Sequence, residues 1–293
     1  MSIDVLINQK LFGNKTMPLE VILGENLHYG DFADDQLNVG TLGKEEFIAY
    51  NPKSIGRGFS VIWNPTEKKK IALRLPQPST TQELTDFYAA VERMVKYWGA
   101  SLVVDGSKVG LNTFMAGFQN MIEFNNKVIK QFSQQILSGG SKNLTLYSAM
   151  YPLTIGKEEA TCFLENPDNY AQWLHEKQSI DVRFANPDFF MGDNGIFARY
   201  TLFNNLPTIF PYKPTVPFGI TDPQTGKTLE CNEWGISIGI LGETSYLCEI
   251  AYSEFLNRIP QDKQLKFDAT HFLLTELTKE EIKALANPIQ QEG

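Results

Sequence analysis

The chain contains three histidines, so any acid–base chemistry that depends on imidazole must use His28, His175 or His271. His28 is followed closely by Asp31 and Asp34, and a carboxylate can orient an imidazole and hold its charged form. His175 falls on the surface of an expected helix. His271 falls on the apolar face of an expected strand, where hydrogen-bonded core histidines are commoner than catalytic ones. His28, Asp31 and Asp34 are therefore the candidate catalytic residues.

The acidic residues that follow His28 belong to a longer polar stretch, residues 25–43, which is rich in Gly, Asp and Asn. This composition predicts a long surface connection, and long ordered loops are often functional. The acidic residues lack the spacing and the closing glutamate of a calcium-binding loop. The sequence thus favours a ligand site at residues 25–43 and predicts no metal site.

Arg57 stands between Gly56 and Gly58 and is a candidate ligand-binding residue. Glycines allow the backbone to come close to an anion that the guanidinium could bind. They also permit a tight entry into the strand that follows. The sequence leaves both interpretations of this Gly-Arg-Gly segment open.

A serine nucleophile is suggested by one literal GxSxG at residues 235–239, because Asp262 or Asp268 and then His271 follow it in the order of an α/β-hydrolase. However, such a serine needs a strand before it and a helix directly after it. Apolar residues alternate on both sides of Ser237 and place it in the middle of a strand. No GxGxxG follows a strand, and P-loop, HExxH and paired CxxC motifs are absent. The sequence therefore predicts neither a serine hydrolase nor a bound cofactor.

The composition is that of an ordinary globular protein, with 293 residues, of which 42% are hydrophobic and 20% are charged. This length suffices for one large domain or two ordinary ones. The net charge of −8 argues against sequence-independent nucleic-acid binding, which needs a basic surface to neutralise phosphates. An acidic surface favours solubility, and it also suits docking to a basic protein.

The cellular location follows from two further features of the sequence. No apolar run approaches the roughly 18 to 20 residues that span a bilayer, and residues 1–7 lack the features of a signal peptide. A cytoplasmic location without membrane contact is therefore expected. Cys162, Cys231 and Cys248 are odd in number and widely spaced, which is typical of reduced thiols in a core.

The elements that must position these residues are clearest in residues 57–106. Thr80 and Glu83 form a capping-box pattern at the start of a helix, whose apolar residues recur at spacings of three and four. A helix with one apolar side needs a sheet to cover. Flanking runs of β-branched and aromatic residues predict that sheet, with a hairpin at 59–63 and 70–75 and a third strand at 101–104.

The segment from Ala72 to Tyr88, ALRLPQPSTTQELTDFY, resembles a family of functionally uncharacterised proteins of similar length from low-GC Gram-positive bacteria. The similarity comprises this capped-helix motif together with the total length of the chain. The resemblance implies a cytosolic bacterial protein. It brings no known activity, cofactor or site residue with it.

The rest of the chain alternates strands and helices. Further strands are expected at 3–7, 19–23, 46–50, 144–155, 180–185, 196–203, 234–241 and 265–274, and further helices at 112–136, 158–164, 167–175, 245–259 and 278–287. The helix at 112–136 should bend or break at Asn125 and Asn126. A Ser- and Gly-rich stretch at 138–143 is the preferred boundary between two halves, 1–140 and 141–293, with one continuous domain as the alternative.

Together these patterns predict an α+β protein of mixed or antiparallel sheets with packed helices. A strand-strand-helix-strand order occurs near 59–104 and again near 196–274, which raises the hypothesis of a duplicated unit. The first functional hypothesis is a non-catalytic interaction protein, an acidic inhibitor or immunity-like partner of a basic protein. The alternatives are an enzyme or small-ligand binder with its site at 25–43, and a homo-oligomeric structural component.

Overall fold

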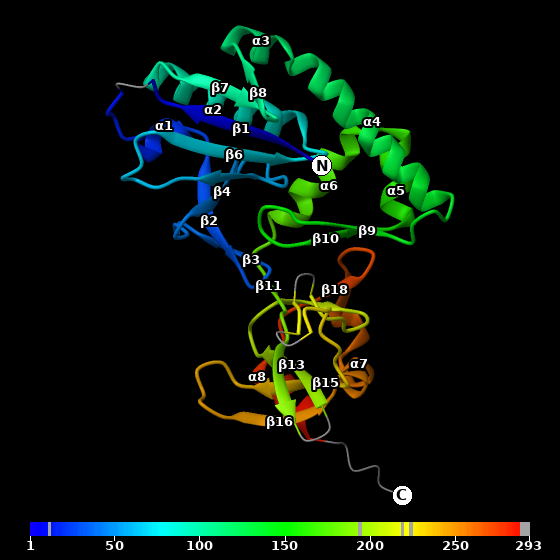
Figure 1. Ribbon diagram of the computed structural model, residues 1–293. Helices are drawn as coiled ribbons and strands as arrows, with labels where there is room; N and C mark the ends of the chain where they lie inside the picture. Colours follow the sequence, from blue (N-terminus) through cyan, green and yellow to red (C-terminus); the bar gives the residue numbers. More distant parts are fainter. Residues whose placement is uncertain (11–12, 193–194, 218–219, 223–224, 288–293) are drawn as a thin grey trace, which may run out of the picture. The chain divides into compact units, whose positions relative to one another are not determined.

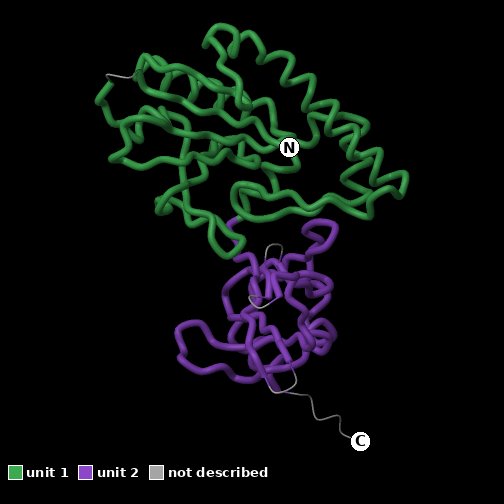
Figure 2. The backbone as a smooth tube through the Cα atoms, in the orientation of Figure 1, with its two compact units in different colours: residues 1–180 green, residues 181–293 purple. Residues whose placement is uncertain are grey.

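The computed structural model describes residues 1–10, 13–192, 195–217, 220–222 and 225–287. The backbone divides into two compact units, residues 1–180 and residues 181–293 (Figure 2). Each unit combines helices with antiparallel or mixed sheets, so the predicted α+β class is confirmed.

The first unit is built on an eight-stranded antiparallel sheet with the strand order β3-β2-β4-β5-β6-β1-β7-β8, and a separate two-stranded sheet pairs β9 with β10. Its elements in chain order are β1 (Ser2–Asn8), α1 (Leu19–Leu23), β2 (His28–Ala33), β3 (Gln36–Val39), β4 (Glu46–Tyr50), β5 (Phe59–Ile62), β6 (Lys70–Pro76), α2 (Thr81–Trp98), β7 (Ser101–Val104), β8 (Ser107–Val109), α3 (Leu111–Ala116), α4 (Phe118–Leu137), β9 (Leu144–Leu146), β10 (Leu153–Ile155), α5 (Lys157–Glu165) and α6 (Asp168–Gln178) (Figure 1).

Helix α2 begins where the sequence predicted. The hydroxyl of Thr80 accepts the backbone N–H of Glu83 at 3.1 Å, and the carboxylate of Glu83 accepts the N–H of Thr80 at 2.8 Å. This reciprocal pair satisfies N–H groups that have no acceptor within the helix. Gly99 ends the helix with a left-handed φ of 57°. The predicted capping box is confirmed.

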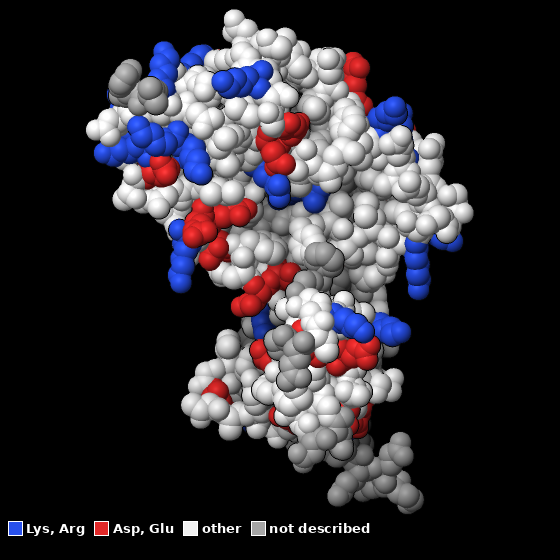
Figure 3. Space-filling view, viewed as in Figure 1, with Lys and Arg blue, Asp and Glu red and all other residues white. Residues whose placement is uncertain are grey.

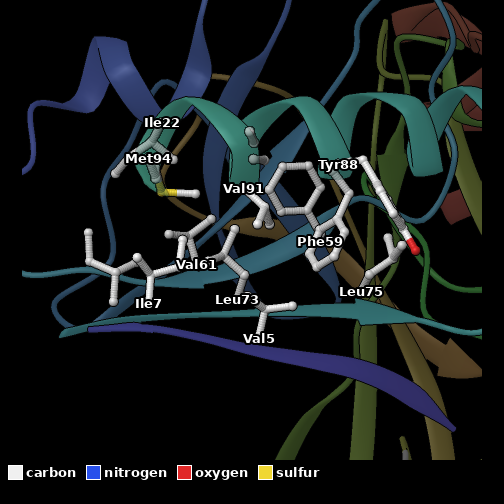
Figure 4. Close-up of a cluster of buried hydrophobic side chains, with 14 of the residues drawn as sticks. Val5, Ile7, Ile22, Phe59, Val61, Leu73, Leu75, Tyr88, Val91 and Met94 are labelled. Carbon is white, nitrogen blue, oxygen red and sulfur yellow. The ribbon is translucent and has the colours of Figure 1, made fainter. Parts of the chain in front are cut away.

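One face of the eight-stranded sheet packs against α2 (Figure 4). Val5, Val61 and Leu73 come from three strands and are buried in one cluster with Val91 and Met94 of α2. Burying each such side chain contributes about 1.5–3 kcal/mol, so this layer is a large source of stability for the unit.

The other face of the sheet carries the polar residues of the same strands, because successive strand residues point to opposite faces. The strand register places Ile48, Ser60, Arg74 and Asp4 in one row across β4, β5, β6 and β1. None of these four side chains is fully buried. The row therefore lies on the side of the sheet away from α2.

Residues 19–23 form helix α1, so the prediction of a strand there was wrong. A short apolar run fits either structure, and its tertiary contacts decide. The guanidinium of Arg93 in α2 donates to the carbonyl oxygens of Val21 at 3.1 Å and Ile22 at 2.7 Å. These bonds satisfy C-terminal carbonyl groups that a short helix cannot satisfy by itself.

Residues 25–43 contain the β2–β3 hairpin, so the prediction of a long surface connection was wrong. Asp34 and Asp35 connect the two strands and take left-handed φ angles of 51° and 54°. Two successive left-handed residues match the twist of the flanking strands in a tight hairpin turn, and Asp tolerates this region better than most residues.

The predicted helix at 112–136 is present but divides at Gly117 into α3 and α4, rather than at Asn125 and Asn126. Asn125 is buried inside α4, where its amide donates to the carbonyl of Met121 at 3.0 Å and accepts the N–H of Ser79 at 2.9 Å. The polar residue in the apolar stripe thus holds the loop before α2. Residues 138–143 follow α4 and lie inside the first unit.

The second unit contains two four-stranded sheets with the orders β11-β14-β18-β17 and β12-β13-β15-β16. Its elements are β11 (Arg183–Phe184), β12 (Asp188–Gly192), β13 (Gly195–Phe203), β14 (Thr208–Pro211), β15 (Glu233–Gly239), β16 (Tyr246–Ala251), α7 (Tyr252–Arg258), a 3-10 turn (Gln261–Lys263), β17 (Gln264–Lys266), β18 (His271–Leu274) and α8 (Lys279–Ala286). Helix α8 lies within the predicted 278–287, and Thr278 and Glu281 form a capping box at its start.

Three predictions for the C-terminal half need correction. The helix expected at 245–259 is strand β16 followed by the short helix α7. The strands expected at 144–155 and 265–274 are each a hairpin of two short strands. The strand expected at 180–185 is shorter, since β11 covers only Arg183–Phe184, and a further strand, β12, lies between it and β13.

The strand orders also contradict the hypothesis of a duplicated unit. Residues 59–104 contribute to one antiparallel sheet, in which β6 lies between β5 and β1. Residues 196–274 contribute to two sheets, and β13 pairs with β15 in parallel. A shared order of elements along the chain therefore does not correspond to a shared topology.

Candidate functional site

A pocket of about 440 Å³ lies on the open face of the eight-stranded sheet, on the side away from α2. This volume is within the range of small-molecule sites. The pocket extends from β2 to β6 and to the loop between β9 and β10. Its apolar lining includes Phe32, Ile48, Pro76 and Tyr147.

Arg57 occupies the wall of this pocket at the entry to β5. Its Nε donates to the carbonyl of Tyr147 at 3.0 Å, and its Nη1 lies 3.1 Å from the carbonyl oxygen of Gln77 and 3.4 Å from that of Pro78. Three backbone acceptors therefore fix the plane of the guanidinium. Nη2 has no hydrogen-bond acceptor in the described part of the chain. A guanidinium fixed in this way offers its remaining N–H groups to a carboxylate or phosphate without losing further side-chain entropy.

Glu83 fixes the backbone that carries Arg57. Its buried carboxylate accepts the backbone N–H groups of Arg57 and Gly58, in addition to that of Thr80. Burial raises the pKa of Glu83, and the N–H groups and the nearby Arg57 charge oppose this rise. Gly56 leaves room for the carboxylate, because a Cβ there would lie 2.3 Å from Cδ of Glu83. The glycines beside Arg57 thus make a tight entry to β5 around a buried acid.

Arg74 projects from the centre of the pocket floor and is partly neutralised. Its Nε lies 2.6 Å from a carboxylate oxygen of Asp4, and both side chains are largely exposed. Asp4 and, to a smaller extent, Glu46 raise the pKa of Arg74. Figure 3 shows acidic and basic side chains close together on this part of the first unit, where Figure 1 draws β1, β6 and β4.

Three polar side chains of the lining have no hydrogen-bond partner in the described residues. Ser148 is only 3% exposed, and its hydroxyl lies near no hydrogen-bonding atom. Asp31 and Glu46 line the pocket at the β2 and β4 side, and neither carboxylate forms a hydrogen bond or ion pair with another described residue. Asp31 lies against Gly43, where a Cβ would be 2.7 Å from Oδ1 of Asp31. A buried hydroxyl without a partner is costly, and a ligand atom would satisfy it.

The structure brings together two of the residues that the sequence singled out. Asp31 and Arg57 line the same pocket, whereas His28 and Asp34 do not. His28 is exposed at the start of β2 and packs edge-on against Tyr50, with ring centroids 6.1 Å apart. Asp34 lies in the β2–β3 turn. The catalytic role of His28, Asp31 and Asp34 remains a prediction.

Arg74, Glu46 and Ser148 were not singled out from the sequence. The alternation of Leu73, Arg74 and Leu75 in β6 does indicate that Arg74 faces away from the core. However, the pocket exists only because β2, β4, β5 and β6 are neighbours and the β9–β10 loop lies beside them. No local pattern in the sequence predicts that neighbourhood.

The remaining serine, histidine and cysteine candidates lie outside this pocket. Ser237 lies in the middle of β15 and is 3% exposed, as the alternation predicted. Nδ1 of His271 lies 3.0 Å from the buried carboxylate of Asp268. Nδ1 of His175 accepts the backbone N–H of Ile55 at 3.0 Å. Cys162, Cys231 and Cys248 are free thiols, and Cys248 lies on a strand rather than on a helix.

Metal-binding clusters and membrane-spanning helices are both absent from the described ranges. Within that part of the chain, no group of three or more His, Cys, Asp or Glu side chains is arranged to hold a metal ion. None of the helices formed by those same residues is long and apolar enough to cross a membrane.

The fold and the pocket define a class of α+β proteins in which an antiparallel sheet is covered by helices on one face and carries a small-molecule-sized pocket on the other. Residues 2–285 match the family described as "Domain of unknown function (DUF4299)", and the chain belongs to that family. This membership agrees with the resemblance to a functionally uncharacterised family. No curated protein and no solved structure shows a significant match.

Proposed function

We propose that this protein binds a small ligand with an anionic group and an apolar body in the pocket on the open sheet face. The main support for the proposal is the hydrogen bonding of the Arg57 guanidinium. Its guanidinium is fixed by three carbonyl oxygens, lines a pocket of about 440 Å³ and keeps Nη2 unbonded in the described part of the chain. Preorganised, bidentate recognition of a carboxylate or phosphate is the chemistry that such a group supports.

The apolar part of the ligand is inferred from the remaining wall. Phe32 and Ile48 line the pocket together with Ser60, which is paired with Ile48 across the sheet. Ligand sites commonly combine such apolar walls with a few fixed polar groups that set orientation. The proposal therefore takes up the small-ligand alternative from the sequence, with Asp31 and Arg57 as members of the site.

A pair of matched substitutions tests the proposal. Ser60→Phe places a bulky side chain in the pocket without touching the core, and Ser101→Phe makes the same change on the same sheet face outside the pocket. Wild-type protein and both variants would be screened by thermal shift against small carboxylates and phosphate esters with apolar groups.

We expect a hit that raises the midpoint of the wild type and of Ser101→Phe by several degrees, as a ligand at about 100 times its Kd adds roughly 2.7 kcal/mol. The same ligand should leave Ser60→Phe unchanged. A ligand that stabilises all three proteins equally binds elsewhere and would refute the assignment of the site, as would silence of the wild type across the panel.

A basic protein partner is the competing proposal, and its support is the net charge of −8. The pocket favours the small ligand, because a fixed guanidinium inside a concave site is built for an anion rather than for a basic surface. The cytoplasmic location, the bacterial origin and the lack of nucleic-acid binding remain predictions from the sequence.

A further inference from the structure

Positive and negative side chains lie at different ends of the pocket, and their positions indicate which charges a ligand would carry. Arg57 stands where β5 begins, next to Gly58. Glu46 stands opposite Ile62, at the other end of β5. Arg74 lies between them on β6 and is paired with Asp4. The pocket therefore has a cationic end at Arg57 and an acidic end at Glu46.

The two ends are separated by a definite length of strand. Because strand residues rise about 3.3 Å each, the backbone positions of Arg57 and Glu46 lie on the order of 15 Å apart. The guanidinium of Arg57 is held at the carbonyl oxygens of Gln77, Pro78 and Tyr147. With a hydrogen bond of about 2.9 Å at each end, a gap of this order fits about three extended residues at roughly 3.3–3.6 Å each.

The charged groups at both ends keep hydrogen-bonding capacity that the protein does not use. Nη2 of Arg57 has no acceptor, and the carboxylate of Glu46 has no hydrogen-bond donor, among the described residues. The hydroxyl of Ser148, next to Tyr147 in the β9–β10 loop, is nearly buried and has no hydrogen-bond partner in that part of the chain. Groups of opposite charge with free capacity at the two ends of an apolar pocket are complementary to a ligand that carries both charges.

We infer that the ligand is a zwitterion of the size of a short peptide, with its carboxylate at Arg57 and its ammonium group at Glu46. This inference rests on the proposed function, since it names the ligand class for the same pocket. The apolar residues Phe32 and Ile48 would contact the middle of the peptide.

The test uses three peptides that differ only at their ends: Gly-Leu-Gly, its N-acetylated form and its C-terminal amide. Isothermal titration would measure the Kd of each peptide for the wild type and for the Glu46→Gln variant. The carboxylate of Glu46 forms no hydrogen bond or ion pair with another described residue, so the variant should keep its fold, which circular dichroism would check.

For the wild type we expect acetylation and amidation each to raise Kd about tenfold or more, the equivalent of roughly 1.4 kcal/mol per lost charged contact. In Glu46→Gln, Gly-Leu-Gly and its acetylated form should bind with Kd values within about twofold of one another. This loss of preference for the free amine is the result that assigns the ammonium site.

Two other outcomes would overturn the inference. In the first, acetylated and free peptides bind the wild type equally, or the only ligands that bind are carboxylates without an ammonium group and Ser60→Phe abolishes their binding. The ligand is then not a zwitterion, and the proposed function stands. If no peptide binds and no anionic ligand depends on Ser60, both the inference and the proposed function fail.

Discussion

Glu83 accepts hydrogen bonds from the backbone of Arg57 and Gly58, although it contacts the pocket only through them. The same carboxylate completes the capping box of α2. One side chain thereby couples the start of the core helix to the loop that presents the cationic end of the pocket. Such a buried acceptor of several N–H groups is costly to replace, because each donor would remain unsatisfied.

Glu83→Gln replaces one of these acceptor oxygens by an amide nitrogen that cannot accept a hydrogen bond. We expect a loss of about 1–3 kcal/mol in the free energy of unfolding, measured by urea denaturation. Glu92→Gln is the matched control on the same helix, since Glu92 forms an exposed pair with Lys96. That control should lose no more than about 0.5 kcal/mol. Equal losses in the two variants would contradict the role given to Glu83.

At the scale of the element, the entry to β5 depends on a left-handed glycine. Gly58 has a φ of 69°, and a Cβ there would lie 2.6 Å from Cγ2 of Ile48 and 3.0 Å from the carbonyl oxygen of Ala49. Gly106 has a φ of 81° in the β7–β8 turn, and a Cβ there would have no other atom within 4 Å among the described residues. The two glycines share the backbone conformation and differ in their surroundings.

Gly106→Ala should therefore cost only the strain of a left-handed alanine, about 1 kcal/mol. Gly58→Ala adds a steric clash against β4 and should cost about 2–4 kcal/mol in total. Urea denaturation of both variants measures the difference. If the two losses agree within error, the close approach of β4 to the entry of β5 is not a constraint on this loop.

The sequence predicts elements well where their cause is local. Thr80 with Glu83 and Thr278 with Glu281 act over three residues, and both capping boxes are present. Prediction failed where the cause is distant or depends on an unusual backbone. Helix α1 depends on Arg93 of α2, and the β2–β3 turn depends on two left-handed aspartates that resemble ordinary loop residues.

The candidate site shows the same division. Arg57 could be named because its flanking glycines are visible in the sequence, and Asp31 because it belongs to an acidic stretch. Glu46 and Arg74 join them only through the strand order of the sheet, and Ser148 only through the position of the β9–β10 loop. Residues that come together only in the folded protein form no recognisable motif in the sequence.

At the scale of the whole molecule, the net charge of −8 is a poor guide to function. The pocket combines Arg57 and Arg74 with Asp31 and Glu46, so its local charges balance. Each unit also has its own buried cluster, one around α2 and one around α7 and α8. The proposed binding site belongs entirely to the first unit, and ligand binding should therefore leave the second unit unperturbed.

The most direct test of the central claim is to map binding on the full-length protein by amide chemical shifts during titration with Gly-Leu-Gly. We predict that the largest changes fall on the pocket lining, at Ile48, Ser60 and Ser148, while amides of β13 and β15 in the second unit stay in place. Changes confined to the second unit, or a spectrum without changes at saturating peptide, would contradict the assignment of this pocket as a peptide-binding site.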